Sequence, residues 1–296
     1  MIPKIFHFVF GLKKQREPFH LAFYLCLESC FQVNRPDEVR LYYQHEPYGR
    51  YWDMIKPRLT LVKVEPPRRI LDFRYRQWFA DRYRYAHLSD FVRVEKLLET
   101  GGVYADMDTL FVNPIPERLY QQRFVLGREN DVPCERTGVM RSSLCNAFIM
   151  AEREAEFGRV WLEKMNAAFD GSWSNHSCQL PHQLSEAMPH LLHVERQESF
   201  YKFQWSREDL RRLFEECHAA DLGDVLSIHL WSHLWWRRLR LDYSRFHAGK
   251  LTEEYVRTAN TTYAVAARRF LPEGGAEPSR TRKLWSGLLR SFSKTG

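Results

Sequence analysis

Residues 101–108 read GGVYADMD: two glycines, and then apolar residues that alternate with a tyrosine and two aspartates. Before the glycines, apolar side chains recur at helical spacing, which predicts a helix over residues 85–100. Gly101 and Gly102 are the stop signal that commonly follows a helix. Residues 103–112 then read as extended chain, which Asn113 and Pro114 close. The stretch therefore predicts a helix that passes directly into a strand carrying two acids.

Strand and helix patterns alternate on both sides of this stretch. The predicted strands cover residues 2–10, 39–44, 59–64, 145–150 and 225–230, and further predicted helices cover residues 18–31 and 154–169. Such an alternation is typical of an α/β sheet whose strands are joined by crossover helices. The chain is therefore predicted to belong to the α/β class.

The two aspartates predict a metal site. In extended chain alternate side chains share a face, so Tyr104, Asp106 and Asp108 are expected to point the same way. Neighbouring carboxylates repel unless a cation lies between them, and oxygen ligands suit a divalent ion whose open positions a diphosphate commonly fills. The spacing alone is common in loops. In the preceding helix Asp90 and Arg93 lie three residues apart, either as part of the same site or as a surface ion pair.

The composition indicates which binding partners and which cellular compartment to expect. The 296 residues are 44% hydrophobic, which is enough for a substantial core, and the net charge of +7 favours polyanionic partners: nucleic acid, anionic lipid or phosphorylated small molecules. The start of the chain fits neither a cleaved signal peptide nor a membrane span, and the six cysteines form no CxxC pair. We therefore expect a cytoplasmic protein.

The last residues differ in kind from the rest. After a linker-like EGGAEPS, the basic segment RTRKLWSGLLRSFSKTG places apolar residues at helix-face spacing. This pattern suits a helix on the anionic inner face of the plasma membrane, or alternatively a helix packed back on the domain. The predicted division is a domain over residues 1–270 and a basic amphipathic tail over residues 271–296.

Residues 86–114, AHLSDFVRVEKLLETGGVYADMDTLFVNP, resemble a known family. The similarity is to the DXD sugar-binding region of retaining glycosyltransferases, which include α1,4-galactosyltransferases, yeast initiating mannosyltransferases and the glucosylating domain of clostridial toxins. Further segments agree in order: IPKIFHFVFG with His7, CNAFIMAER with Asn146, ESFYKFQW, and SIHLW with His229. The matching positions of the DXD region are Ala86, Ser89, Asp90, Arg93, Gly101, Gly102, Tyr104, Asp106 and Asp108.

The resemblance implies a GT-A type fold, with a Rossmann-like nucleotide-binding sheet, helices on both faces and a smaller acceptor-side region. It implies that Asp108, with Asp106 and His229, holds Mn2+ or Mg2+. The implied catalytic residues are Asp106, Asp108 and Asn146. The implied donor-binding residues are Phe8, Phe10, Ser89, Asp90, Arg93, Tyr104, Asp106 and Trp231. Packing within the fold is the alternative for the first-strand aromatics, His229 and Trp231, and capping of a strand is the alternative for Asn146.

The function that the resemblance implies is metal-dependent transfer of a hexose, with retention at the anomeric carbon. The donor is expected to be a nucleotide sugar such as UDP-galactose, UDP-glucose or UDP-GlcNAc, and the acceptor a glycan or glycolipid in surface polysaccharide synthesis, in capsule or lipopolysaccharide. Two other classes compete. DMDTL also resembles the start of haloacid-dehalogenase phosphatases, although GGVYA is a poor preceding strand. Interleaved arginines and aromatics in WWRRLRL favour a nonenzymatic nucleic-acid or membrane binder, but no nucleic-acid-binding motif is present, so no nucleic-acid partner is expected.

Overall fold

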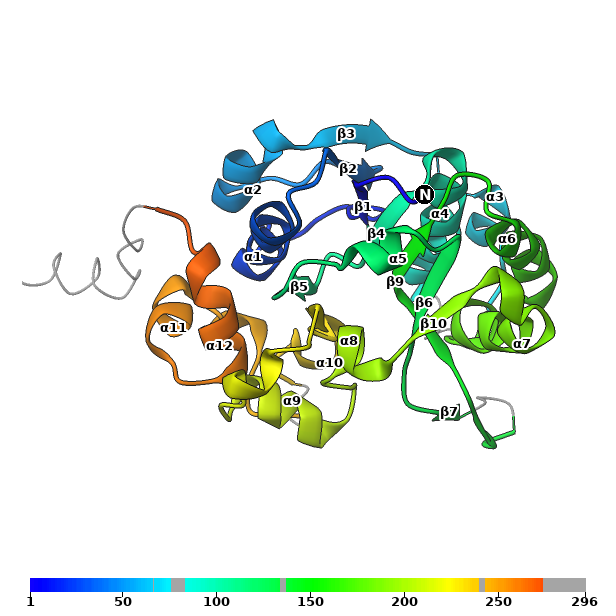
Figure 1. Ribbon diagram of the computed structural model, residues 1–296. Coiled ribbons are helices and arrows are strands. Elements are labelled where there is room, and N and C mark those ends of the chain that lie inside the picture. The colour runs from blue at the N-terminus through cyan, green and yellow to red at the C-terminus, as the bar shows by residue number, and fades with distance from the viewer. Residues whose placement is uncertain (66, 76–82, 134–136, 240–242, 274–296) are drawn as a thin grey trace, which may run out of the picture.

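A seven-stranded sheet forms the centre of the molecule, in the order β10-β6-β9-β4-β1-β2-β3 (Figure 1). The computed structural model describes residues 1–65, 67–75, 83–133, 137–239 and 243–273. Of the described strands of this sheet, only β9 runs antiparallel to its neighbours. The strands are β1 (Ile5–Val9), β2 (Glu38–Tyr43), β3 (Thr60–Lys63), β4 (Gly102–Ala105), β6 (Phe124–Arg128), β9 (Leu144–Ala151) and β10 (His193–Glu195).

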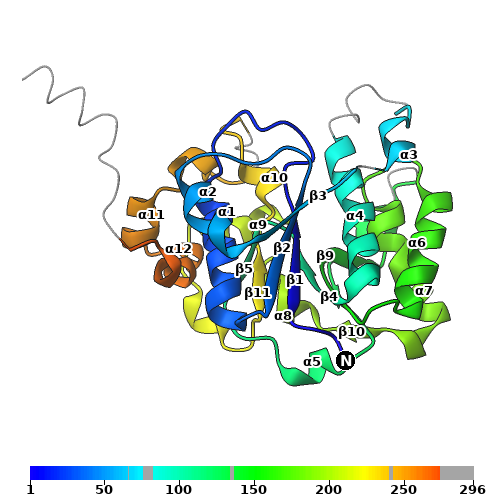
Figure 2. The same ribbon diagram turned by 90° about the horizontal axis from the view of Figure 1, so that it is seen from above.

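Helices cover both faces of the sheet, as burial of mostly parallel strands requires. One face carries α1 and α2, and the other carries α4, α6 and α7 (Figure 2). Each face packs its own apolar cluster against the sheet. The helices are α1 (Leu21–Ser29), α2 (Arg50–Ile55), α3 (Arg68–Leu71), α4 (Arg84–Thr100), α5 (Glu117–Tyr120), α6 (Glu156–Ala168), α7 (Leu180–Ala187), α8 (Gln197–Tyr201), α9 (Arg207–Phe214), α10 (Ser232–Trp235), α11 (Glu253–Thr258) and α12 (Thr262–Ala267).

Two small antiparallel pairs lie outside the main sheet. β5 (Thr109–Phe111) pairs with β11 (Ser227–His229), and β7 (Val132–Pro133) pairs with β8 (Met140–Arg141). The first pair joins the segment after the acids to a strand more than a hundred residues later. It therefore brings the late part of the chain to the acid pair.

The architecture confirms the predicted α/β class of the GT-A type, with a central, mostly parallel sheet between helices. The helix predicted over residues 85–100 is α4. The single extended segment predicted over residues 103–112 is wrong, because the chain turns between β4 and β5. The backbone N–H of Thr109 donates to the carbonyl of Asp106 at 3.0 Å, which closes that turn.

The glycine pair lets α4 pass into β4 without a clash. Gly101 and Gly102 have φ angles of 69° and 130°, in the region that favours glycine. A Cβ at Gly102 would collide with the carbonyl oxygen of Ile5 and the ring of His7. His7 is fully buried and its Nε2 lies 2.9 Å from the carbonyl oxygen of Gly101, so β1 holds the end of α4 in place.

The domain boundary near residue 270 stays a prediction. From residue 274 onward the predicted tail lies outside the described residues. Among the helices that the structure describes, none has the length and apolar character needed to cross a bilayer.

Candidate functional site

The turn between β4 and β5 carries both acids. The N–H of Asp106 donates to the carbonyl of Ala147 on β9 at 2.8 Å, which fixes the start of the turn to the central sheet. On the other side, β5 pairs with β11 so that His229 lies opposite Thr109. The pairing therefore places the imidazole of His229 beside the two carboxylates, and the predicted convergence of the acids arises from a turn and not from strand alternation.

Asp106, Asp108 and His229 form a compact cluster. One ligand atom from each lies within 4.8 Å of the others. Nε2 of His229 lies 3.2 Å from Oδ1 of Asp108 and 3.7 Å from Oδ2 of Asp106. Asp108 and His229 are buried, whereas the Asp106 side chain is 25% exposed and gives the cluster its opening to solvent.

Neighbouring charges act against the effect of burial on the pKa values of the three residues. Burial raises the pKa of Asp106 above its ordinary value, with Arg93 acting against it. Burial also acts to raise the pKa of Asp108, but His229 and hydrogen bonds from Ser232 outweigh it and hold that pKa well below its usual range. For His229, burial lowers the pKa, while Asp108 and Asp106 outweigh it and raise the pKa. The cluster thus holds at least one firmly ionised carboxylate beside a basic nitrogen.

This donor set fits a divalent cation. Carboxylate oxygens suit Mg2+ and Mn2+, and neutral imidazole is a common metal ligand. A ligating nitrogen must be free of its proton, so binding of a cation by His229 would compete with the hydrogen bond between its Nε2 and Asp108. Asp106, Asp108 and His229 are therefore the residues that can hold the predicted ion.

Arg93 connects α4 to the acid pair. Its Nη2 lies 3.2 Å from Oδ1 of Asp106 and 3.3 Å from Oδ1 of Asp90, and its Nη1 donates to the carbonyl of Asn146 at 2.8 Å. Nη2 also donates to Oγ of Ser89 at 3.2 Å. The guanidinium is 5% exposed, so the pair of Asp90 and Arg93 is buried and the alternative of a surface ion pair is wrong.

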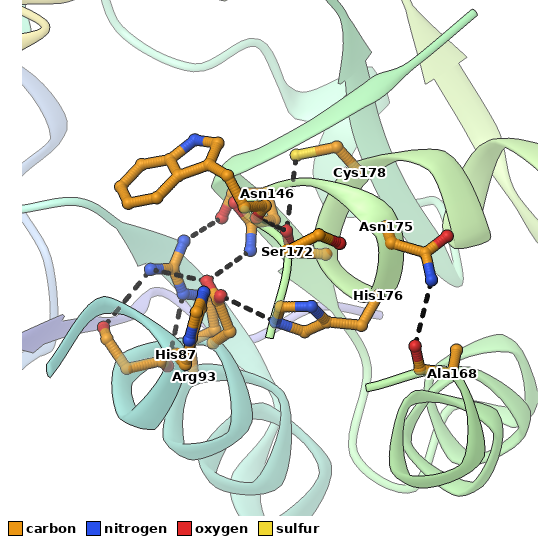
Figure 3. Close-up of polar contacts among 12 residues, drawn as sticks. His87, Arg93, Asn146, Ala168, Ser172, Asn175, His176 and Cys178 are labelled. Atoms are coloured by element: carbon orange, nitrogen blue, oxygen red, sulfur yellow. Dashed lines mark hydrogen bonds and ion pairs between the residues drawn. The ribbon is translucent and has the colours of Figure 1, made fainter. Parts of the chain in front are cut away.

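Asp90 is held from three directions. Nδ2 of Asn146 donates to Oδ1 at 2.8 Å, and Nε2 of His176 lies 3.0 Å from Oδ2, in addition to the contact with Arg93. Figure 3 shows Arg93, Asn146 and His176 converging from α4, from β9 and from the segment before α7. The side chain of Asn146 is thus engaged by Asp90 and does not stand free at a reacting centre.

Tyr104 is buried and positions Asp106. Its ring is 1% exposed, and its predicted contact with the transferred sugar stays a prediction. Its hydroxyl donates to Oδ1 of Asp106 at 2.5 Å and lies 3.4 Å from Oγ of Ser89. The Arg93 guanidinium lies over the Tyr104 ring at 4.6 Å, a cation–π contact that fixes the arginine.

The aromatic residues predicted to bind the donor differ in their exposure. Phe8 is fully buried, which fits the alternative of packing within the fold, and its predicted role in stacking on the base stays a prediction. Phe10 is partly buried and packs against Phe19 and Phe23 at the edge of the core. Trp231 is 5% exposed and its Nε1 donates to the carbonyl of Phe203 at 2.8 Å, so packing within the fold accounts for it.

Trp231 has a further backbone role that the sequence did not reveal. Its φ of 51° is unusual for a residue with a side chain. This turn directs the N–H of the following Ser232 at Oδ2 of Asp108, at 2.7 Å. Ser232 and His176 are the contacts that sequence reasoning missed: Ser232 was signalled only by its place just after SIHLW, and His176 by nothing in its surroundings.

Comparison with known proteins finds a family similarity over the region that contains Asp106 and Asp108. Residues 27–125 match the family described as glycosyltransferase sugar-binding region containing DXD motif. Over 290 residues the chain is 26% identical to glucan organizing enzyme 1 of Cryptococcus neoformans var. grubii, covering 96% of this chain and 74% of that protein. The family match favours the glycosyltransferase prediction over the phosphatase and nonenzymatic alternatives.

Solved structures with a partly similar fold were also found. One is a galactosyltransferase, LgtC, in complex with donor and acceptor sugar analogues, with a TM-score of 0.48 and 10% identity over 94% of this chain and 99% of that one. Another is the PaToxG glycosyltransferase, with a TM-score of 0.42 and 13% identity over 64% of this chain and 70% of that one.

Proposed function

We propose that this chain, whose residues 27–125 match the glycosyltransferase sugar-binding region containing a DXD motif, transfers a hexose from a UDP-sugar to a glycan or glycolipid acceptor. The observation that carries the proposal is the convergence of Asp106, Asp108 and His229 from two distant segments. A nucleotide sugar is a diphosphate ester, and such a cluster is the kind of site that holds a diphosphate through a divalent ion. The net charge of +7 adds a general attraction for an anionic donor.

The ion that we propose is Mn2+, with Mg2+ as the alternative. Asp106, Asp108 and His229 would hold it. Once bound, it would neutralise the charge that develops on the leaving diphosphate as the anomeric bond breaks. Ser232 keeps Asp108 ionised and oriented, and Tyr104 and Arg93 keep Asp106 in place.

The transferred hexose is proposed to lie next to Asp90, Arg93 and Asp106. A carboxylate and a guanidinium present acceptors and donors at fixed positions, which suits the recognition of sugar hydroxyls. Both oxygens of Asp90 already accept hydrogen bonds from the chain, which makes Asp90 a poor nucleophile. We therefore propose that transfer proceeds without a covalent intermediate on Asp90, and we propose retention at the anomeric carbon because of the family resemblance.

The acceptor and the biosynthetic process are proposed from the similarity to known glycosyltransferases and to glucan organizing enzyme 1. The relative's name refers to glucan, a polymer of hexose, which supports a polysaccharide or glycolipid acceptor. Surface polysaccharide assembly, in capsule or lipopolysaccharide, is the proposed setting. We also propose a cytoplasmic protein that lies at the inner face of the plasma membrane through its basic tail.

The test is hydrolysis of UDP-glucose, UDP-galactose, UDP-GlcNAc and the matching GDP-sugars, with and without Mn2+. We expect turnover of at least one UDP-sugar that depends on the metal and that a glycan acceptor increases. Absence of metal-dependent turnover on every donor would contradict the proposal. Turnover of a simple phosphate monoester in its place would support the phosphatase alternative.

A further inference from the structure

His176 lies in a π-helix, η4 (Asn175–Gln179), between α6 and α7. Such turns are rare and are frequently found at functional sites. Here the backbone is fixed on both sides. The indole Nε1 of Trp161 donates to the carbonyl of His176 at 3.0 Å, and Nδ2 of Asn175 donates to the carbonyl of Ala168 at 3.0 Å. The π-helix therefore holds the side chain of His176 in a fixed position.

The imidazole of His176 is fully buried among rings. The rings of Phe91, Phe169 and His87 lie 6.0, 5.0 and 5.3 Å from it. Within the described part of the chain, its Nδ1 has no hydrogen-bond partner. A buried N–H without an acceptor is unfavourable, so the proton belongs on Nε2, which faces Oδ2 of Asp90 at 3.0 Å. Figure 3 shows the ring of His176 pointing toward α4, which carries Arg93.

The hydrogen bond from His176 fixes the rotation of the Asp90 carboxylate. Nη2 of Arg93 lies between Oδ1 of Asp90 and Oδ1 of Asp106, at 3.3 and 3.2 Å. By occupying Oδ2 of Asp90, His176 leaves Oδ1 to the guanidinium of Arg93 and the amide of Asn146. About one of the roughly four acceptor positions of Asp90 then remains for a hydroxyl of a ligand.

We propose that His176 is a positioning residue that fixes Asp90 for the transferred hexose and thereby contributes to the choice of donor sugar. This inference rests on the proposed function. It concerns the sugar moiety alone, because His176 contacts neither Asp106, Asp108 nor His229 in the described structure.

The test compares His176→Phe and His176→Gln with the wild type. Phenylalanine keeps the ring packing and removes the donor, whereas the glutamine amide can place an N–H where Nε2 lies. With the donor on which the wild type is most active, we expect His176→Phe to lower kcat/KM on the order of 10²-fold and to narrow the preference between UDP-glucose and UDP-galactose. His176→Gln is expected to recover most of the loss, and the affinity for UDP with Mn2+ should stay within about threefold of the wild type in both.

The matched control is His87→Phe, which changes a histidine of the same aromatic cluster that makes no hydrogen bond to Asp90 in the described structure. It should keep the donor preference of the wild type. Should His176→Phe fail to fold, His176→Asn, whose shorter amide cannot reach, replaces it in the comparison with His176→Gln. Unchanged kcat/KM and donor preference in the folded variants, or a loss that Gln does not recover, would overturn the inference while the proposed function stands. Inactive wild-type protein on every donor would overturn both.

Discussion

Nε2 of His229 lies 3.2 Å from Oδ1 of Asp108, although 121 residues separate the two in the chain. The contact exists because β5 and β11 pair in antiparallel register directly after the turn that carries the acids. The central sheet and the separate two-stranded sheet of β5 and β11 together make one site.

The hydroxyl of Tyr104 is predicted to support activity and not the fold. Tyr104→Phe removes the hydrogen bond to Asp106 and keeps the ring that packs against Arg93. A hydrogen bond to a charged group contributes about 1.5–3 kcal/mol, so kcat/KM for donor hydrolysis should fall roughly 10- to 150-fold. Steady-state kinetics together with the thermal midpoint will check this. A variant with full activity would show that Asp106 does not need Tyr104.

Gly102 is predicted to be required for the stability of the fold. Gly102→Ala places a Cβ against Ile5 and His7 in a backbone region that alanine avoids, and should lower the free energy of unfolding by roughly 1–3 kcal/mol or more. The control is Gly223→Ala, because a Cβ there meets no atom within 4 Å, and its effect should stay within about 0.5 kcal/mol. Urea denaturation of both variants makes the comparison. Equal stabilities would mean that β1 can move away from Gly102.

Glu195, at the end of β10, is predicted to make stability depend on pH. Burial opposes its ionisation, but Arg118, Ser199 and His193 outweigh it and lower the pKa from 4.5 to about 2. A lowered pKa contributes stability that is present above about pH 4.5 and is lost as the pH falls toward about 2. Between pH 7 and pH 3, the wild type should lose roughly 1–2 kcal/mol more than Glu195→Gln.

Urea denaturation at several pH values will measure that difference. Glu186→Gln is the control, because that side chain is 70% exposed, and it should follow the wild type. Parallel pH profiles for the wild type and Glu195→Gln would show that the pairing with Arg118 does not stabilise the fold.

Local patterns in the sequence predicted β1, β2, β3, β4 and β9 of the central sheet and the helices α1, α4 and α6, because period and turn chemistry are local properties. They did not predict β6, β10 or the shorter helices. The helix before the glycines and the strand at β9 follow from apolar spacing alone. The turn at Asp106 escaped prediction because Met107, the residue between the acids, is apolar and continues the alternation. Only the pairing of β5 with β11 shows that the chain must bend there.

The burial of individual site residues was harder to predict. Phe8, Tyr104 and Trp231 were assigned to the donor by resemblance, yet their burial depends on which helices cover the sheet. His176 was missed because its contact with Asp90 joins a π-helix to α4 across 86 residues. No local pattern specifies an approach of that kind.

The most direct test of the central claim is a titration of Mn2+, in the presence of UDP, into the wild type and Asp108→Asn, followed by isothermal calorimetry. The substitution keeps the shape of the side chain and removes its charge, so both proteins should fold alike. The wild type should bind one Mn2+ per chain, and Asp108→Asn should bind it on the order of 10²-fold more weakly or not at all. Equal Mn2+ affinity in the two proteins would contradict the claim that these acids hold a cation.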